Sequence, residues 1–207
     1  MKAIFRGRQD YIPLWREMQD FTNNRNENTP DTIWFVEHPP VFTLGLNANK
    51  EHLLSPGKIP VIEVDRGGQV TFHGPGQLMV YPLIDLQRMK VGVRDLLTAL
   101  EQSIIDLAAS YSIDATKRPE APGVYVNNRK LASIGLRIRR GSSFHGLALN
   151  VSIDLEPFER INPCGYSKMK MVDLQRLGIN LSLEDAAGDF LPLFLKQISF
   201  FQRYKKF

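Results

Sequence analysis

The feature that most constrains this fold is a long amphipathic segment between about Gly92 and Tyr111. Its apolar residues recur every three or four positions, as on one face of an α-helix: Val93, Leu96, Leu97, Leu100, Ile104, Leu107, Ala108 and Tyr111. Segments with the pattern of β-strands precede and follow it along the chain. This order of strands, long helix and strands favours an α+β fold over regular βαβ repeats.

Short apolar runs bounded by turn residues predict the strands. They cover residues 31–37, 41–44, 61–65, 76–84, 124–126, 129–138 and 144–153. Asn127 and Asn128 separate two of these runs and tolerate positive φ, so they predict a hairpin turn. Further helices are expected after Asp10 and after Ser182. We therefore predict one α+β domain over residues 1–207, with a mixed, mostly antiparallel sheet and packed helices.

Composition narrows the class of protein. Of the 207 residues, 43% are hydrophobic and 23% are charged, which is ordinary for a globular protein with a sizeable core. No run approaches the length of a membrane-spanning helix, and the N-terminus lacks the apolar segment of a signal peptide. The single cysteine excludes an intramolecular disulfide and suits a reducing compartment. We therefore expect a cytoplasmic protein with no membrane partner.

The charged residues and the histidines match no common cofactor or nucleic-acid motif. The net charge of +4 comes from scattered basic residues, and the basic runs at 137–140 and 203–206 are typical of a solvated surface. The four histidines, at positions 38, 52, 73 and 145, form no zinc motif. Neither a phosphate-binding P-loop nor a serine nucleophile elbow occurs. We therefore expect no metal, no cofactor and no nucleic-acid partner.

The only cysteine is the first candidate for chemistry. Cys164 lies between Pro163 and Gly165, two residue types that favour a tight turn. A turn of this kind presents a thiol to a cleft, where it can act as a nucleophile. A small buried hydrophobic residue is the other common role of a free cysteine. The sequence pattern alone leaves both interpretations open.

Lys130 is the second candidate, because of where strand alternation puts its side chain. On a strand over residues 129–138, Lys130 shares a face with the apolar residues Ala132, Ile134, Leu136 and Ile138. An inward-facing ammonium group is costly unless it is paired or gives up its proton, so Lys130 is a candidate proton acceptor. A lysine at the strand edge whose amine reaches water is the alternative.

A glycine-rich segment at 66–77 is the third candidate. Four glycines, at positions 67, 68, 74 and 76, surround Gln69, Thr71 and His73. Glycines let a backbone approach a ligand closely and leave its N–H donors accessible. A tight connection between strands explains one pair of these glycines, but explains both pairs less well.

Four segments together resemble one enzyme family. They are Arg66–Gln77, Arg129–Gly135, Phe144–Val151 and Asn162–Gly165, and their sequences are similar to those of the octanoyltransferases of lipoate biosynthesis, in the same order. The likeness extends over roughly residues 11 to 180. The resemblance implies a fold like that of the catalytic domains of biotin and lipoate protein ligases.

The resemblance also implies a reaction, partners and site residues. An octanoyl group would pass from octanoyl-acyl carrier protein to a lysine of lipoyl domains in 2-oxoacid dehydrogenase complexes and of the glycine cleavage H protein. Cys164 would be the acyl-thioester nucleophile, and Lys130 would promote ionisation of its thiol. The residues matching substrate-binding elements are Arg66, Gly67, Gly68, Gln69, Val70, Thr71, Phe72, His73, Ser133, Ile134, Gly135, Gly146, Leu147 and Ala148.

An eight-carbon chain needs a narrow apolar groove, which the small residues among these positions would leave open. Phe72, Leu131 and Leu147 are expected to line it. His73 and His145 are expected to hold the loops through hydrogen bonds to the backbone, with proton transfer as the alternative.

Two other functions remain possible at this point. An ATP-dependent lipoate or biotin ligase of the same fold would form an acyl-adenylate and have no use for Cys164. A basic binding module would bind nucleic acid or a carrier protein with steep salt dependence and form no covalent adduct.

Overall fold

The computed structural model describes residues 1–166 and 169–204, except the side chains of Cys164 and Tyr204. Ten strands form two sheets: β1 (Lys2–Arg8), β2 (Thr32–Glu37), β3 (Val41–Leu44), β4 (Val61–Glu63), β5 (Val70–His73), β6 (Gln77–Leu83), β7 (Thr116–Lys117), β8 (Gly123–Val126), β9 (Arg129–Arg139) and β10 (Ser142–Asn150). The α-helices are α1 (Tyr11–Asn24), α2 (Leu86–Met89), α3 (Val93–Ser110) and α4 (Leu183–Tyr204). Short 3₁₀ turns are η1 (Lys50–His52), η2 (Glu156–Arg160), η3 (Pro163–Gly165) and η4 (Gln175–Leu177).

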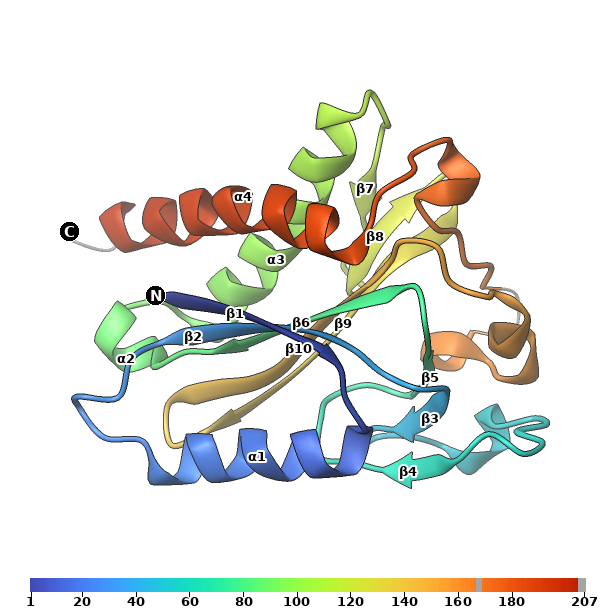
Figure 1. Cartoon of the computed structure of the whole chain (residues 1–207), viewed down its shortest axis with the longest axis horizontal. Helices are drawn as coiled ribbons and strands as arrows, with labels where there is room; N and C mark the ends of the chain where they lie inside the picture. The colour runs from blue at the N-terminus through green and yellow to red at the C-terminus, as the bar shows by residue number, and fades with distance from the viewer. Residues whose placement is uncertain (167–168, 205–207) are drawn as a thin grey trace.

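The larger sheet has seven strands in the order β1-β2-β6-β10-β9-β8-β7, and the smaller has three in the order β4-β3-β5. Only the β1–β2 and β3–β4 pairs are parallel, which confirms the predicted mixed, mostly antiparallel sheet. Helices α3 and α4 cover one face of the large sheet, and α1 covers the other beside the small sheet (Figure 1). No helix in the described part of the chain is both long enough and apolar enough to cross a membrane.

Alternation along the central strands supplies both cores. In β6, Leu78 and Val80 pack under α3 and α4, whereas Met79 and Tyr81 pack against α1. The strand is therefore apolar on both sides, which explains its nearly continuous apolar sequence. The apolar stripe predicted at 92–111 is the buried face of α3.

The hairpin turn and the helix starts also follow the sequence. Asn127 and Asn128 both have positive φ, of 49° and 63°, as a tight hairpin turn requires. The hydroxyl of Ser182 accepts the amide N–H of Asp185 at 3.0 Å and caps α4. By contrast, the sequence does not predict strands β1, β5 and the two-residue β7.

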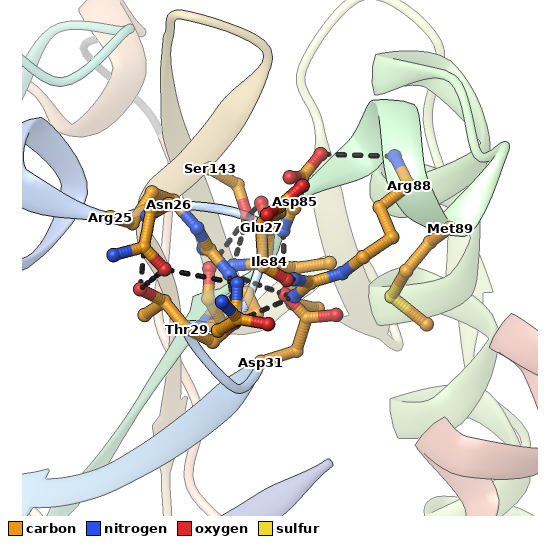
Figure 2. A network of polar contacts seen from close by, with 12 residues as sticks. Arg25, Asn26, Glu27, Thr29, Asp31, Ile84, Asp85, Arg88, Met89 and Ser143 are labelled. Atoms are coloured by element: carbon orange, nitrogen blue, oxygen red, sulfur yellow. Dashed lines mark hydrogen bonds and ion pairs between the residues drawn. The ribbon is translucent and has the colours of Figure 1, made fainter.

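Asp31 ties the end of α1 to the start of α2 (Figure 2). Its Oδ1 accepts hydrogen bonds from Nη2 of Arg25 at 2.6 Å, Nη2 of Arg88 at 2.7 Å and the backbone amide of Asp85 at 2.8 Å. The Arg25 side chain is only 6% exposed, so the Asp31 carboxylate is needed to stabilise its buried positive charge. The network fixes the loop at 25–31 against the β6–α2 junction.

Removing this carboxylate should destabilise the fold. We expect Asp31→Ala to lower the free energy of unfolding by about 3 kcal/mol, because it leaves the Arg25 charge buried without its counter-ion. Urea unfolding of the two proteins measures this difference. Asp20→Ala, an exposed change on α1, is the matched control and should change stability by less than about 0.5 kcal/mol. Equal stability of the Asp31 and Asp20 variants would contradict the expectation.

Candidate active site

The glycine-rich segment forms one wall of a groove. Arg66 is buried, and its Nη2 donates to the carbonyl oxygens of Thr43 at 2.7 Å and Gln69 at 2.8 Å. Its Nη1 donates to the carbonyl of Gly67 at 2.9 Å. The guanidinium thus holds the loop at 66–69 in a tight curve against β3, and this loop covers β9 and β10.

All but two of the predicted substrate-binding residues line this groove, which we call the central groove. Its full lining is Tyr11, Arg66, Gly67, Gly68, Gln69, Val70, Thr71, His73, Met79, Tyr81, Ser133, Ile134, Gly135, His145, Gly146 and Ala148. Glycines at two of these positions let neighbouring backbone pack closely against β9 and β10. A Cβ on Gly135 would lie 3.0 Å from the carbonyl oxygen of Gly67, and one on Gly146 would lie 2.0 Å from that of Val80.

Three apolar residues expected to line the groove do not. Leu131 and Leu147 are buried in the core under α3 and α4, and Phe72 packs against Phe42 and Phe158. In β10 the cause is alternation, since Leu147 points away from the face that Gly146 and Ala148 share. That part of the prediction is wrong, and Tyr11, Met79 and Tyr81 supply the apolar walls instead.

His73 belongs to a chain of buried hydrogen bonds beside the groove. Its Nδ1 lies 2.8 Å from Gln77 Oε1, and its Nε2 lies 3.2 Å from the hydroxyl of Thr43. Gln77 Nε2 in turn donates to Asn150 Oδ1 at 2.9 Å. Burial holds the pKa of His73 well below its usual value, so the ring is neutral. Both ring nitrogens have side-chain partners, which favours the loop-holding role, although through side chains and not the backbone.

Lys130 is buried, as predicted, but on the other face of the sheet. Val124 of β8 lies opposite Ala132, whereas the next residue, Tyr125, lies opposite Lys130. Leu131 is therefore an extra residue in β9, and Leu131 and Ala132 both enter the core under α3 and α4. The bulge turns Lys130 away from that apolar set, so the predicted shared face is wrong.

The Lys130 side chain lies over Gly123 and is 0% exposed. A Cβ at Gly123 would be 2.6 Å from Lys130 Cε, so this glycine makes room for the lysine stem. The Lys130 amine donates to the carbonyl of Pro122 at 2.9 Å and lies 5.4 Å from the centre of the Tyr125 ring. Because Gly123 pairs with Ser133, the amine lies beside the start of the central groove.

Cys164 occupies the predicted tight turn, η3, in which Gly165 has a φ of +81°. The side chain of Cys164 lies outside the described atoms, so its contact with Lys130 stays a prediction. The backbone places the turn at the groove, since a Cβ on Gly165 would lie 3.7 Å from Gln69 Cγ. Beyond the turn, the chain returns to β9: the Lys130 amide donates to the Lys170 carbonyl at 2.8 Å.

The match to known proteins covers most of the chain. Residues 10–194 match the family described as the lipoyl protein ligase A/B catalytic domain. Octanoyltransferases from Shewanella sp. (strain ANA-3) and Shewanella oneidensis are each 58% identical over 95% of this chain and 90% of their own. The chain belongs to the octanoyltransferase family. It is therefore an acyltransferase, as its resemblance implied.

Solved structures of low identity share the fold of this octanoyltransferase family member. A lipoate-protein ligase A bound with ATP aligns with a TM-score of 0.74 at 12% identity, over 96% of this chain and 86% of that one. A biotin protein ligase from Aquifex aeolicus aligns with a TM-score of 0.61 at 13% identity, over 98% and 72%. These likenesses confirm the predicted fold class. At such low identity they say nothing about the reaction.

Several groove residues carried no sequence signal. Tyr11, Met79 and Tyr81 come from α1 and β6 and meet only in the folded chain. The same holds for Asp65, whose carboxylate lies 2.9 Å from Nε2 of His145 although 80 positions separate them. Within the described ranges, no three histidine, cysteine or acidic side chains gather where they would hold a metal ion.

Proposed function

We propose that this protein transfers an octanoyl group from octanoyl-acyl carrier protein to a lysine of lipoyl domains, with the acyl group carried on Cys164 in between. The observation that carries the proposal is the meeting of three elements: the turn that holds Cys164, the buried amine of Lys130 and the start of the central groove. The near relatives are named octanoyltransferases, which supports octanoyl as the group that is transferred.

The backbone around Cys164 supports its nearness to Lys130. Gly165 and Tyr166 line a surface hollow together with Glu120 and Ala121. The next residue, Pro122, is the one whose carbonyl accepts the hydrogen bond from the Lys130 amine. The chain that leaves η3 then pairs with β9 at Lys130 itself. The cysteine turn is thus fixed to the lysine strand from two sides.

In the first step, the thiol of Cys164 gives up its proton, either to Lys130 or with the Lys130 ammonium stabilising the thiolate. The thiolate attacks the carbonyl carbon of the octanoyl thioester. The bond to the carrier's sulfur breaks, and the carrier leaves as a thiol after taking up a proton. The octanoyl group is then a thioester of Cys164.

In the second step, the acceptor lysine must be an uncharged amine to attack this thioester. In this proposal Lys130 takes its proton. The amide bond forms as the bond to Cys164 sulfur breaks, and the thiol is restored. Forming an amide from a thioester is downhill, so the reaction needs no nucleotide.

The central groove suits the tail of this substrate. Its lining includes Tyr11, Met79 and Tyr81, which supply apolar surface for an alkyl chain. Burying about six methylene groups at about 0.8 kcal/mol each would contribute roughly 5 kcal/mol to binding. That is enough to distinguish octanoyl from chains several carbons shorter.

The acceptors we propose are the lipoyl domains of 2-oxoacid dehydrogenase complexes and the glycine cleavage H protein, in the cytoplasm. One structural neighbour, a bipartite lipoate protein ligase from Thermoplasma acidophilum, is described together with its E2 lipoyl domain. That pairing supports a lipoyl domain as the partner of this fold.

The test is the intact mass of the protein after mixing with octanoyl-acyl carrier protein without nucleotide. We expect a gain of one octanoyl group, lost again when a lipoyl domain is added. Cys164→Ala should gain none. An ATP-dependent ligase would leave the protein unmodified and would act only on free octanoate with ATP and Mg²⁺, and that result would refute the proposal.

A further inference from the structure

His145 has a backbone conformation that is unusual for its place inside strand β10. Its φ is +56°, in the left-handed region, although it pairs in register with Leu136 of β9. Regular alternation would put Phe144 and His145 on opposite faces of the sheet. Here the two rings stack at 5.1 Å, and Phe144 packs in the core on the α1 side. The strained residue thus brings its ring to the face that carries the central groove.

Asp65 determines which nitrogen of His145 carries the proton. Oδ1 of Asp65 lies 2.9 Å from His145 Nε2 and also accepts from Trp15 Nε1 at 2.7 Å. Burial raises the pKa of Asp65, but the hydrogen bonds from His145, Trp15 and Gln19 outweigh it and lower the pKa to about 2. The ionised carboxylate only accepts hydrogen bonds, so His145 Nε2 is the donor.

The other ring nitrogen of His145 is left as an acceptor. The ring is 1% exposed, and burial lowers its pKa, so it is neutral with Nδ1 unprotonated. Among the described residues, this Nδ1 has no hydrogen-bond partner. Buried polar atoms are nearly always paired in folded proteins, so an unpaired one in a groove lining indicates a ligand that donates a hydrogen bond.

The sheet geometry puts His145 where an eight-carbon chain would end. The Lys130 amine lies beside Gly123, which pairs with Ser133 of β9. His145 pairs with Leu136, which lies three residues beyond Ser133 on β9. Its own strand, β10, is two positions from β8 in the sheet. Three residues and two strand spacings correspond to about 14 Å along the diagonal. An extended octanoyl chain with its sulfur spans roughly 10 Å, so its last carbons approach the imidazole ring.

We propose that His145, held by Asp65, is a specificity-determining residue at the far end of the central groove, and that the enzyme takes acyl chains with a terminal hydroxyl group in addition to octanoyl. The inference rests on the proposed octanoyl transfer. The hydroxyl would donate to Nδ1, and the transfer through Cys164 would be unchanged.

The test compares two carrier-protein thioesters of the same length, 8-hydroxyoctanoyl and nonanoyl, which differ only in a terminal hydroxyl or methyl group. A hydroxyl buried without an acceptor would lower kcat/KM about 5- to 100-fold relative to the methyl. We expect kcat/KM for 8-hydroxyoctanoyl to be within threefold of that for nonanoyl, or higher. A value more than threefold lower would overturn the inference. Octanoyl is measured alongside, and failure to transfer it would refute the proposed function instead.

The variant His145→Asn removes the imidazole and tolerates the positive φ. We expect the ratio of kcat/KM for 8-hydroxyoctanoyl to that for nonanoyl to fall at least about fivefold in this variant. An unchanged ratio would contradict the role of His145. If the variant does not fold, the ¹⁵N signal of Nδ1 in the wild-type acyl-enzyme decides. It should differ between the hydroxylated and the plain chain, and equal signals would count against the hydrogen bond.

Discussion

Replacing Lys130 with methionine is expected to slow octanoyl transfer about 100- to 10,000-fold while the protein stays folded. Methionine has a similar length and fits over Gly123, but it carries neither a charge nor a transferable proton. Both proposed steps need one of these, first to ionise the thiol of Cys164 and then to deprotonate the acceptor amine. The measurement is the single-turnover rate of acylation and of transfer, each followed by intact mass.

The stability of this variant should change little. Exchanging a buried charged group for an apolar one of similar volume is often close to neutral, although the Pro122 carbonyl loses its 2.9 Å hydrogen bond. Lys117→Met is the matched control, because Lys117 is exposed on β7, next to β8. It should leave both rates unchanged. A Lys130→Met protein that transfers octanoyl at more than a tenth of the wild-type rate would show that Lys130 is not part of the chemistry.

Features that depend on neighbouring residues followed from the sequence. The stripe on α3 requires only the 3.6-residue period, and the turn at Asn127–Asn128 requires only two residues that tolerate positive φ. The glycine-rich segment forms one wall of the central groove, and its role in binding a ligand stays a prediction. These predictions needed no knowledge of what lies across the sheet.

Features that depend on a distant partner did not follow. The bulge at Leu131 appears only when β9 pairs with β8, and it reverses the face on which Lys130 lies. Assigning faces by strict alternation along a strand assumes that no residue is inserted, so a bulge shifts every assignment on one side of it. The left-handed φ of His145 has the same effect in β10, and its partner Asp65 lies 80 positions away in sequence. Both deviations from regular strand geometry lie at the proposed active site, where such deviations are concentrated.

Three strands were missed, and two of them, β1 and β5, were missed for related reasons. Strand β1 is largely exposed at the sheet edge and carries Lys2, Arg6 and Arg8, so it has no alternating apolar pattern. Its strand structure comes from parallel pairing with β2. Strand β5 lies inside the glycine-rich segment, and it is defined by antiparallel pairing with β3. In each case the hydrogen-bonding partner, rather than local preference, determines the strand.

Acidification below pH about 6.5 should destabilise the protein. Burial lowers the pKa of His38 to about 4, partly offset by its hydrogen bond to the Gln9 carbonyl and by nearby acidic groups. Burial, with the charges of His38 and Arg66, holds the pKa of His73 well below its usual value. Below pH about 6.5 the unfolded chain therefore binds protons that the folded chain does not, and stability falls as the pH falls.

His38 alone should cost about 1.6 kcal/mol of stability between pH 6.5 and 5, and His73 adds a loss of the same sign. Burial also lowers the pKa of His145, which adds to the loss of stability. Urea unfolding at pH 7, 6 and 5 measures the slope in a range where Asp65, with a pKa of about 2, does not yet contribute. His38→Gln should reduce the average slope by about 1 kcal/mol per pH unit, because it removes most of one excess proton of the unfolded state. A wild-type stability that is flat from pH 7 to 5 would mean that these rings become protonated in the folded protein. The assignment of His73 as a neutral ring beside the groove would then be wrong.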